Sequence, residues 1–179
     1  MEYPVYLDNA ATTAVDPAVV ETMLPFFLSA YGNPATLYSV GMMAREAVDH
    51  AREVVADMIH ASPDEIVFTS GGTEADNAAI KGVASAYKSR GNHLITSAIE
   101  HHAVLEPMET LEHSGYDLDI LPVDAEGRVS PQAVKSCLRP STLLVSIMHA
   151  NNEIGTVQPI EEIGTLCREH GVLFHTDAV

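Results

Sequence analysis

Residues 92–123, NHLITSAIEHHAVLEPMETLEHSGYDLDILPV, contain the pattern that decides the fold. An apolar run at 92–99 is followed by a helical stretch at 100–115 and then by a second β-rich run at 116–123. The helical stretch ends in glycine, as many helices do, and we expect its one proline, Pro107, to lie in its first turns. This order predicts two strands joined by a helix.

The same alternation of strand and helix continues from residue 65 to the end of the chain. Nearly all-apolar strands that alternate with helices are typical of a parallel sheet covered on both faces. We therefore predict an α/β fold with three αβα layers and a mainly parallel sheet. The predicted strands are 65–70, 92–99, 116–123, 142–149 and 172–177, and the predicted helices are 73–91, 100–115, 127–139 and 159–171.

The first 60 residues have a different organisation. Asp16 followed by Pro17 is typical of a helix start, and residues 41–61 form a long amphipathic stretch. There is no clear place for a central strand. We expect residues 1–60 to be a helical segment that packs beside the sheet or belongs to a smaller domain, and residues 61–179 to be the α/β domain.

Composition narrows the classes of partner. The formal net charge is −16, from 25 acidic residues against 9 Lys and Arg, which disfavours nucleic acids and anionic membranes. We see no signal peptide at the N-terminus and no run of roughly 18 apolar residues that could cross a membrane. The two cysteines are not in a CxxC pair and no histidine stands at metal spacing, so we expect a cytoplasmic protein with reduced thiols and no metal site.

Ligands of open parallel sheets bind beyond the carboxyl ends of the strands, so the strand-to-helix junctions are the places to search. In TSGGTEADN (69–77) two glycines precede a helix expected to start at Thr73. Glycines allow close approach to a ligand, and free N–H groups at a helix start favour an anion such as phosphate. Neither GxGxxG nor a P-loop is present, and a tight turn with Thr73 as a simple N-cap is the alternative.

Two further junctions carry polar side chains. His101 and His102 follow a predicted strand, where an imidazole could stack on a planar ligand or move protons. The alternative is a pair of surface histidines at a helix start. Residues 148–160 bring Asn151 and Asn152 to the end of the most apolar strand, and the alternative there is an Asx-type turn.

The last junction is FHTDAV (174–179), in which a short strand delivers Asp177 to the same edge. A carboxylate there could serve a ligand, or it could be the N-cap of an element that follows. Since the chain stops two residues later, we expect it to be the N-terminal portion of a longer protein.

Six motifs together resemble the cysteine desulfurases, which belong to the class V aminotransferase group of fold type I pyridoxal-phosphate (PLP) enzymes. They occur in order along essentially the whole chain. They are YLDNAATT (6–13), GNPATLYSVG (32–41), EIVFTSGGTEADNAAIKG (65–82), ITSAIEHHAVLE (95–106), VSIMHANNEIGTVQPI (145–160) and FHTDAV (174–179).

The resemblance implies roles for five residues. Gly72 and Thr73 match positions that hold the PLP phosphate. His101 matches the histidine that stacks on the pyridine ring and moves protons. Asn152 matches an asparagine near the phenolic oxygen of PLP, and Asp177 matches the aspartate that pairs with the pyridine nitrogen, which helps the ring accept electrons.

The resemblance also implies a reaction and partners. The family removes sulfur from L-cysteine, leaving alanine, and carries it as a persulfide on an enzyme cysteine. The sulfur then passes to an iron–sulfur scaffold or another acceptor protein, and the complete enzyme is expected to be a homodimer.

The sequence departs from the family where the family's cofactor-binding lysine and persulfide cysteine should follow Asp177. The lysines present are Lys81, Lys88 and Lys135, none of them expected at the site. The chain alone is therefore expected to be inactive. A non-catalytic remnant or binding module, and a related class V enzyme such as a selenocysteine lyase, stay open as alternatives.

Overall fold

The computed structural model describes residues 5–179, so the first four residues of the stretch inspected for a signal peptide lie outside it. The chain forms two compact units, which meet in sequence between Phe68 and Thr69. Each unit is described by itself. The assignment of residues 1–60 and 61–179 to the two domains of the resembled family stays a prediction.

The N-terminal unit consists of helices. α1 spans Pro17–Leu28, α2 spans Ser39–Ile59 and a short 3-10 turn, η1, spans Pro63–Glu65. α1 starts as predicted, because the Asp16 carboxylate accepts the Ala18 N–H at 2.8 Å and Pro17 occupies the first helical position. Within residues 5–179, no helix is both long and apolar enough to cross a membrane.

The predicted strand at 65–70 is wrong. Residues 66–69 pair with no other strand in the described part of the chain, and Val67 is 78% exposed. The Arg52 side chain instead donates to the Ile66 carbonyl, and its guanidinium lies 5.0 Å from the centre of the Phe68 ring. A β-rich sequence forms a strand only where a partner supplies the ladder hydrogen bonds.

The second unit contains a four-stranded sheet in the order β2-β1-β3-β4, with every neighbouring pair parallel. The strands are β1 His93–Ser97, β2 Asp117–Leu121, β3 Thr142–Ser146 and β4 Leu173–His175. The helices are α3 Gly72–Ala86, α4 His102–His113, α5 Pro131–Cys137 and α6 Ile160–Glu169. These four strands and four helices match the predicted order.

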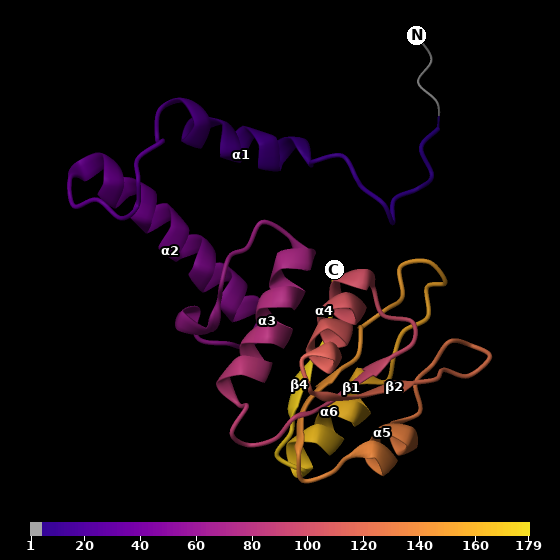
Figure 1. The fold of residues 1–179 in the computed structure, drawn as a ribbon. Coiled ribbons are helices and arrows are strands. Elements are labelled where there is room, and N and C mark those ends of the chain that lie inside the picture. The colour runs from indigo at the N-terminus through magenta and orange to yellow at the C-terminus, as the bar shows by residue number, and fades with distance from the viewer. Residues whose placement is uncertain (1–4) are drawn as a thin grey trace. The chain divides into compact units, whose positions relative to one another are not determined.

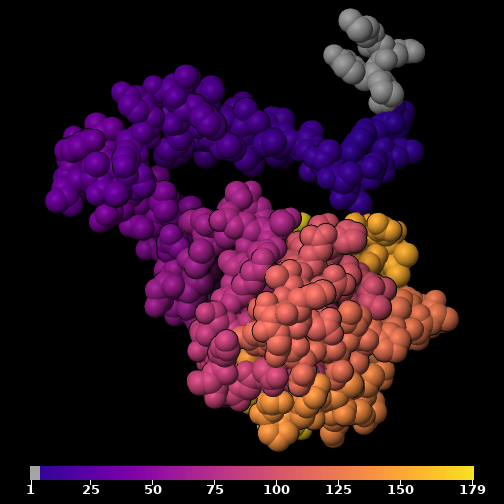
Figure 2. Space-filling view, viewed as in Figure 1, coloured from indigo at the N-terminus to yellow at the C-terminus, as the bar shows by residue number. Residues whose placement is uncertain are grey.

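The predicted three layers are confirmed. α3 and α4 lie on one side of the sheet and α5 and α6 on the other (Figure 1). Alternate strand residues face opposite layers, as the period of two requires. Seen from the side of Figure 2, α4 and its neighbours leave only small parts of the yellow C-terminal elements visible. The α3–α4 side of the core contains Ile80, Leu94, Val104, Met108 and Leu144, and the α5–α6 side contains Ile95, Val134, Val145, Ile163 and Cys167.

Helix α4 contains a buried proline, and α3 compensates for it. Pro107 is the sixth residue of the helix and lacks the N–H that would bond to the Ala103 carbonyl. The Asn77 side-chain amide of α3 reaches that carbonyl at 3.4 Å and also donates to the Thr73 carbonyl at 3.0 Å. One side chain therefore joins the first turn of α3 to the position that proline leaves unbonded in α4.

Candidate functional site

The topology locates a crevice at the carboxyl ends of β1 and β3. β1 and β3 are neighbours; from β1 the chain crosses to β2 on one side, whereas from β3 it crosses to β4 on the other side. Connections that leave neighbouring strands in opposite directions open a crevice beyond the strand ends, which is where ligands of such sheets bind. All four predicted junctions lie at this edge of the sheet.

The start of α3 presents unbonded donors. The N-cap is Gly71, so the alternative interpretation, in which Thr73 is a simple N-cap, is wrong. The N–H groups of Gly72, Thr73 and Glu74 have no acceptor within residues 5–179, and neither has the Thr73 hydroxyl. The Glu74 carboxylate accepts from the N–H and hydroxyl of Ser70, both at 2.6 Å, and these bonds lower the pKa of Glu74. The remaining donors can hold an anion.

His101 lies between α3 and the β1 end. It is the N-cap of α4, and its Nδ1 accepts the Ala103 N–H at 3.1 Å. The neutral ring therefore carries its proton on Nε2. His101 and His102 are both exposed, as the alternative interpretation expected, with ring centres 6.2 Å apart. His101 thus combines a structural role at the helix start with an Nε2 that has no hydrogen-bond partner among the described residues.

The two asparagines after β3 have different roles. Asn151 makes the Asx-type turn, since its Oδ1 accepts from the N–H groups of Glu153 and Ile154 at 2.9 and 3.0 Å. Asn152 is exposed, and its side chain has no hydrogen-bond partner among the described residues. It lines a hollow of about 290 Å³ whose other lining residues include Glu100 and His101.

Asp177 lies beside the end of β3. The pairing of β3 with β4 continues past both strands, because the His149 N–H donates to the Asp177 carbonyl at 2.7 Å. The Asp177 side chain accepts the Val179 N–H at 3.0 Å, as an N-cap residue would. A Cβ placed on Gly72 would lie 2.6 Å from Val179, so the residues after β4 lie against the first residue of α3.

Three hydrogen-bonded or paired side chains, two of them buried and His175 partly buried, support this arrangement, and sequence reasoning missed them. His175 Nδ1 lies 2.7 Å from the Ser146 hydroxyl, and its Nε2 lies 3.4 Å from Asp76 Oδ1. Burial, with the negative charge of Asp177, raises the pKa of Asp76 to about 6, while His101 opposes the shift. Burial lowers the pKa of His175, although the negative charge of Asp177 partly opposes this shift. Near neutral pH we therefore describe His175 as neutral, accepting from Ser146 and donating to Asp76.

Glu100, at the end of β1, is a second group that sequence reasoning missed. It is 6% exposed, and burial raises its pKa to about 7, with the charges of Asp177 and Asp76 adding to the shift. The signal was available, since Glu100 follows an apolar strand just as Asp177 does. The burial of the Glu100 side chain could not be predicted from the sequence pattern.

The lysines lie away from this edge. Lys81 shares a hollow of about 230 Å³ with Thr73 and His101, but it follows Thr73 by two helical turns, about 12 Å along the axis. Lys88 follows the end of α3, and Lys135 lies on α5 in the opposite layer. Among residues 5–179, no group of three or more His, Cys, Asp or Glu is arranged to hold a metal ion.

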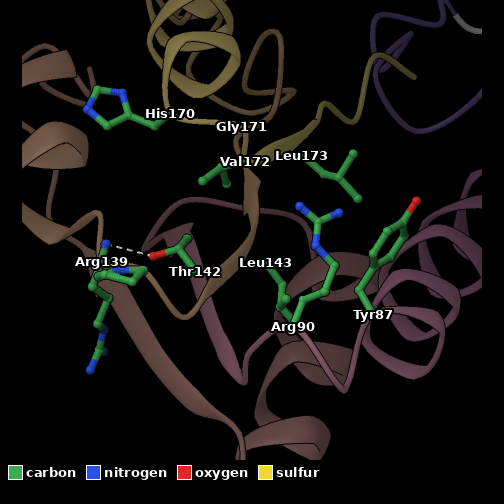
Figure 3. Close-up of a pocket in the computed structure, with 10 residues that line it drawn as sticks. Tyr87, Arg90, Arg139, Thr142, Leu143, His170, Gly171, Val172 and Leu173 are labelled. Carbon is green, nitrogen blue, oxygen red and sulfur yellow. Dashed lines mark hydrogen bonds between the residues drawn. The ribbon is translucent and has the colours of Figure 1, made fainter.

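A separate hollow of about 130 Å³ lies at the amino ends of β3 and β4, away from this site. Figure 3 shows the Arg90 side chain extending into it, whereas the Arg139 side chain points away. Arg139 is paired with Asp117 and Asp119 at 3.5 and 3.6 Å. With a single arginine extending into it, this hollow lacks the converging polar groups present at the carboxyl edge.

Comparison with known proteins matches residues 5–179 to the family described as Aminotransferase class-V. The chain belongs to the class V aminotransferase family. It is 52% identical over its whole length to "Cysteine desulfurase IscS" of Dictyoglomus turgidum, and 55% identical over 98% of its length to "Putative cysteine desulfurase IscS 1" of Bacillus subtilis. The chain spans 45% and 46% of the length of these two relatives.

Solved structures of the family agree with the fold. A protein titled "NIFS-LIKE PROTEIN" matches with a TM-score of 0.94 at 42% identity, over 98% of this chain and 48% of that one. A second, titled "SspA in complex with cysteine", matches with a TM-score of 0.93 at 46% identity, over 97% of this chain and 50% of that one. The predicted family and α/β fold are thereby confirmed.

Proposed function

We propose that the protein is a PLP-dependent cysteine desulfurase and that the carboxyl edge of this sheet contributes to its cofactor pocket. The observation that carries the proposal is the meeting of three features at one edge. These are the donors at the start of α3 and the Asn152 side chain, both without a partner among residues 5–179, and the carboxylate of Asp177. The match of the whole chain to relatives named cysteine desulfurase supports it.

The described residues fit a phosphorylated ligand. Gly72 and Thr73 offer two backbone N–H groups and a hydroxyl, none of which has a protein acceptor within residues 5–179. The positive end of the α3 dipole adds to the attraction of an anion. In this proposal these groups hold the phosphate, despite the acidic composition of the whole chain.

The same edge fits a cationic ring. Asp177, Asp76 and Glu100 influence one another electrostatically, and no Lys or Arg side chain is paired with any of them in the described part of the chain. A protonated pyridine nitrogen would neutralise the Asp177 carboxylate. His101 would stack on the ring, and Asn152 would donate to its phenolic oxygen.

When bound, PLP withdraws electrons from the substrate carbons and so weakens the bond from the β-carbon to sulfur. In the proposed reaction His101 Nε2 moves a proton, and L-cysteine gives alanine as sulfur passes to a thiolate that becomes a persulfide. The proposal extends to a cytoplasmic homodimer that passes the sulfur to an iron–sulfur scaffold or another acceptor protein.

The test is titration of this chain with PLP, followed by absorbance and circular dichroism of the ring. We expect PLP to bind without forming an imine with a lysine at the site, since no lysine lies at the edge of the sheet. Borohydride, which reduces such an imine to a stable amine, should therefore not attach PLP to the chain there. Asp177→Asn should weaken PLP binding roughly tenfold. Thr73→Ala should weaken binding of PLP but not of pyridoxal, which lacks the phosphate. The matched control is Thr165→Ala, on the exposed surface of α6. Equal affinity of wild type and Asp177→Asn would refute the assignment of the ring nitrogen contact.

A further inference from the structure

The carboxyl group of Glu100 bridges the two loops that form the crevice. Its Oε1 accepts from the Ser97 hydroxyl at 2.5 Å, at the end of β1, and from the Met148 N–H at 3.0 Å, in the segment that follows β3. All three residues are buried, Met148 at 3% exposure. One oxygen therefore joins the ends of two neighbouring strands across the topological switch point.

A second contact joins the same two loops. The Asn151 side-chain N–H donates to the Ile99 carbonyl at 2.9 Å. Asn151 is next to Asn152 and Ile99 is two residues before His101, so the two contacts fix the loops that present both proposed cofactor contacts. Glu100 lines the hollow between these loops.

We infer that Glu100 is a positioning residue that sets the spacing between His101 and Asn152 through its bonds to Ser97 and Met148. This inference rests on the proposed function for the identity of the ligand, but the contacts that carry it belong to this chain. Glu100 itself is not placed in contact with the cofactor.

The environment of the second carboxyl oxygen of Glu100 indicates whether the side chain is protonated or ionised. Oε2 is buried and has no hydrogen-bond partner within residues 5–179. A buried carboxylate oxygen without a donor is costly, whereas the protonated acid removes the charge and still leaves Oε1 free to accept. The carboxylates of Asp76 on α3 and Asp177 after β4 disfavour a third negative charge in this region. Reach and hydrogen-bond acceptance, rather than charge, are therefore the properties that positioning requires.

Three substitutions separate reach from charge. Glu100→Gln keeps the length and the accepting oxygen but removes the charge. Glu100→Asp keeps the ionisable group but is shorter by one methylene, so it cannot reach both donors. Glu100→Ala removes both properties. Glu112, exposed in the last turn of α4, receives the same three substitutions as a matched control.

The first measurement needs no ligand. We expect Glu100→Asp and Glu100→Ala to speed amide exchange at Met148 at least roughly tenfold relative to Val145, and to shift the NMR signals of the Asn151 side-chain amide and the His101 ring. In Glu100→Gln, the exchange rate of the Met148 amide should stay within about threefold of wild type. The NMR signals of Asn151 and His101 should stay near their wild-type positions. If Glu100→Ala does not fold, Ser97→Ala removes one of the two bonds and should give a smaller change in the same direction.

The second measurement is the affinity for PLP. Glu100→Asp and Glu100→Ala should weaken it roughly tenfold, and Glu100→Gln should restore it. Rescue by Asp but not Gln would overturn the inference, as would faster Met148 exchange with unchanged Asn151 and His101 signals. If wild type binds no PLP, the proposed function fails, and the NMR comparison still decides whether Glu100 positions the two loops.

Discussion

The raised pKa of Glu100 predicts a pH-dependent loss of stability that one substitution should remove. Burial raises this pKa from 4.5 to about 7. Each pKa unit corresponds to about 1.4 kcal/mol, so ionising Glu100 in the folded chain costs about 3 kcal/mol more than in the unfolded chain. Glu100→Gln cannot ionise and should not incur this cost.

The direction follows from proton binding. Between pH 4.5 and about 7 the folded chain holds the Glu100 proton, whereas the unfolded chain has released it. The folded state therefore binds more protons, and the free energy of unfolding falls as pH rises through this window. Asp76, whose pKa is raised from 3.8 to about 6, contributes in the same direction at lower pH in both wild type and variant.

The assay is urea unfolding of wild type and Glu100→Gln between pH 4.5 and 8, followed by circular dichroism. The variant should gain about 3 kcal/mol relative to wild type across this range, with unchanged slopes against urea. Glu112→Gln, which changes an exposed carboxylate, should follow the wild-type profile. Parallel profiles for wild type and Glu100→Gln would refute the argument that Glu100 is protonated in the folded chain.

Three further outcomes test the packing of the second unit. Ile163→Ala, in the fully buried α5–α6 side of the core, should lower the free energy of unfolding by about 3 kcal/mol in urea, and a loss below about 1 kcal/mol would contradict the described packing. Gly91→Ala would place a Cβ 2.2 Å from the Ser141 carbonyl oxygen and should cost about 2 kcal/mol, whereas Gly82→Ala on α3 meets open space and should be neutral or stabilising; similar losses for both would be inconsistent with this geometry. Burial raises the pKa of both cysteine thiols, that of Cys167 to about 11, but Cys167 is fully buried and Cys137 only half-buried. At pH 8 a thiol reagent should therefore modify Cys137 at least tenfold faster, as measured by peptide mass, and faster modification of Cys167 would show that α6 opens.

Local signals predicted most of the fold of the second unit. Apolar strands, Gly115 and Gly171 after helices, and the serine before Pro131 lie where the structure has strand, helix end or cap, whereas α3 ends at Ala86, before the predicted Gly91. Each of these signals depends only on residues that are close together in the sequence, so it can be recognised before the fold is known. The segment 66–69 shows the limit, since its residues favour β-structure but pair with no strand in the described part of the chain.

The candidate site divides in the same way. Polar residues at strand ends could be found from the sequence, and with them the loops of His101, Asn152 and Asp177. Glu100 follows a strand as Asp177 does, but its burial, like that of Asp76, comes from packing among distant segments and could not be predicted from the sequence. Likewise, only the structure separates Asn151, which makes the turn, from Asn152, whose side chain is left free.

The bond between Asn77 and the carbonyl of Ala103 has an evolutionary consequence. The carbonyl is available to α3 because Pro107 provides no N–H for it. Replacing the proline would give the carbonyl a partner within its own helix and remove one reason for keeping an asparagine on α3. Positions 77 and 107, 30 residues apart in sequence, should therefore vary together among related sequences, although the Asn77 side chain bonds to Ala103 and not to the proline itself.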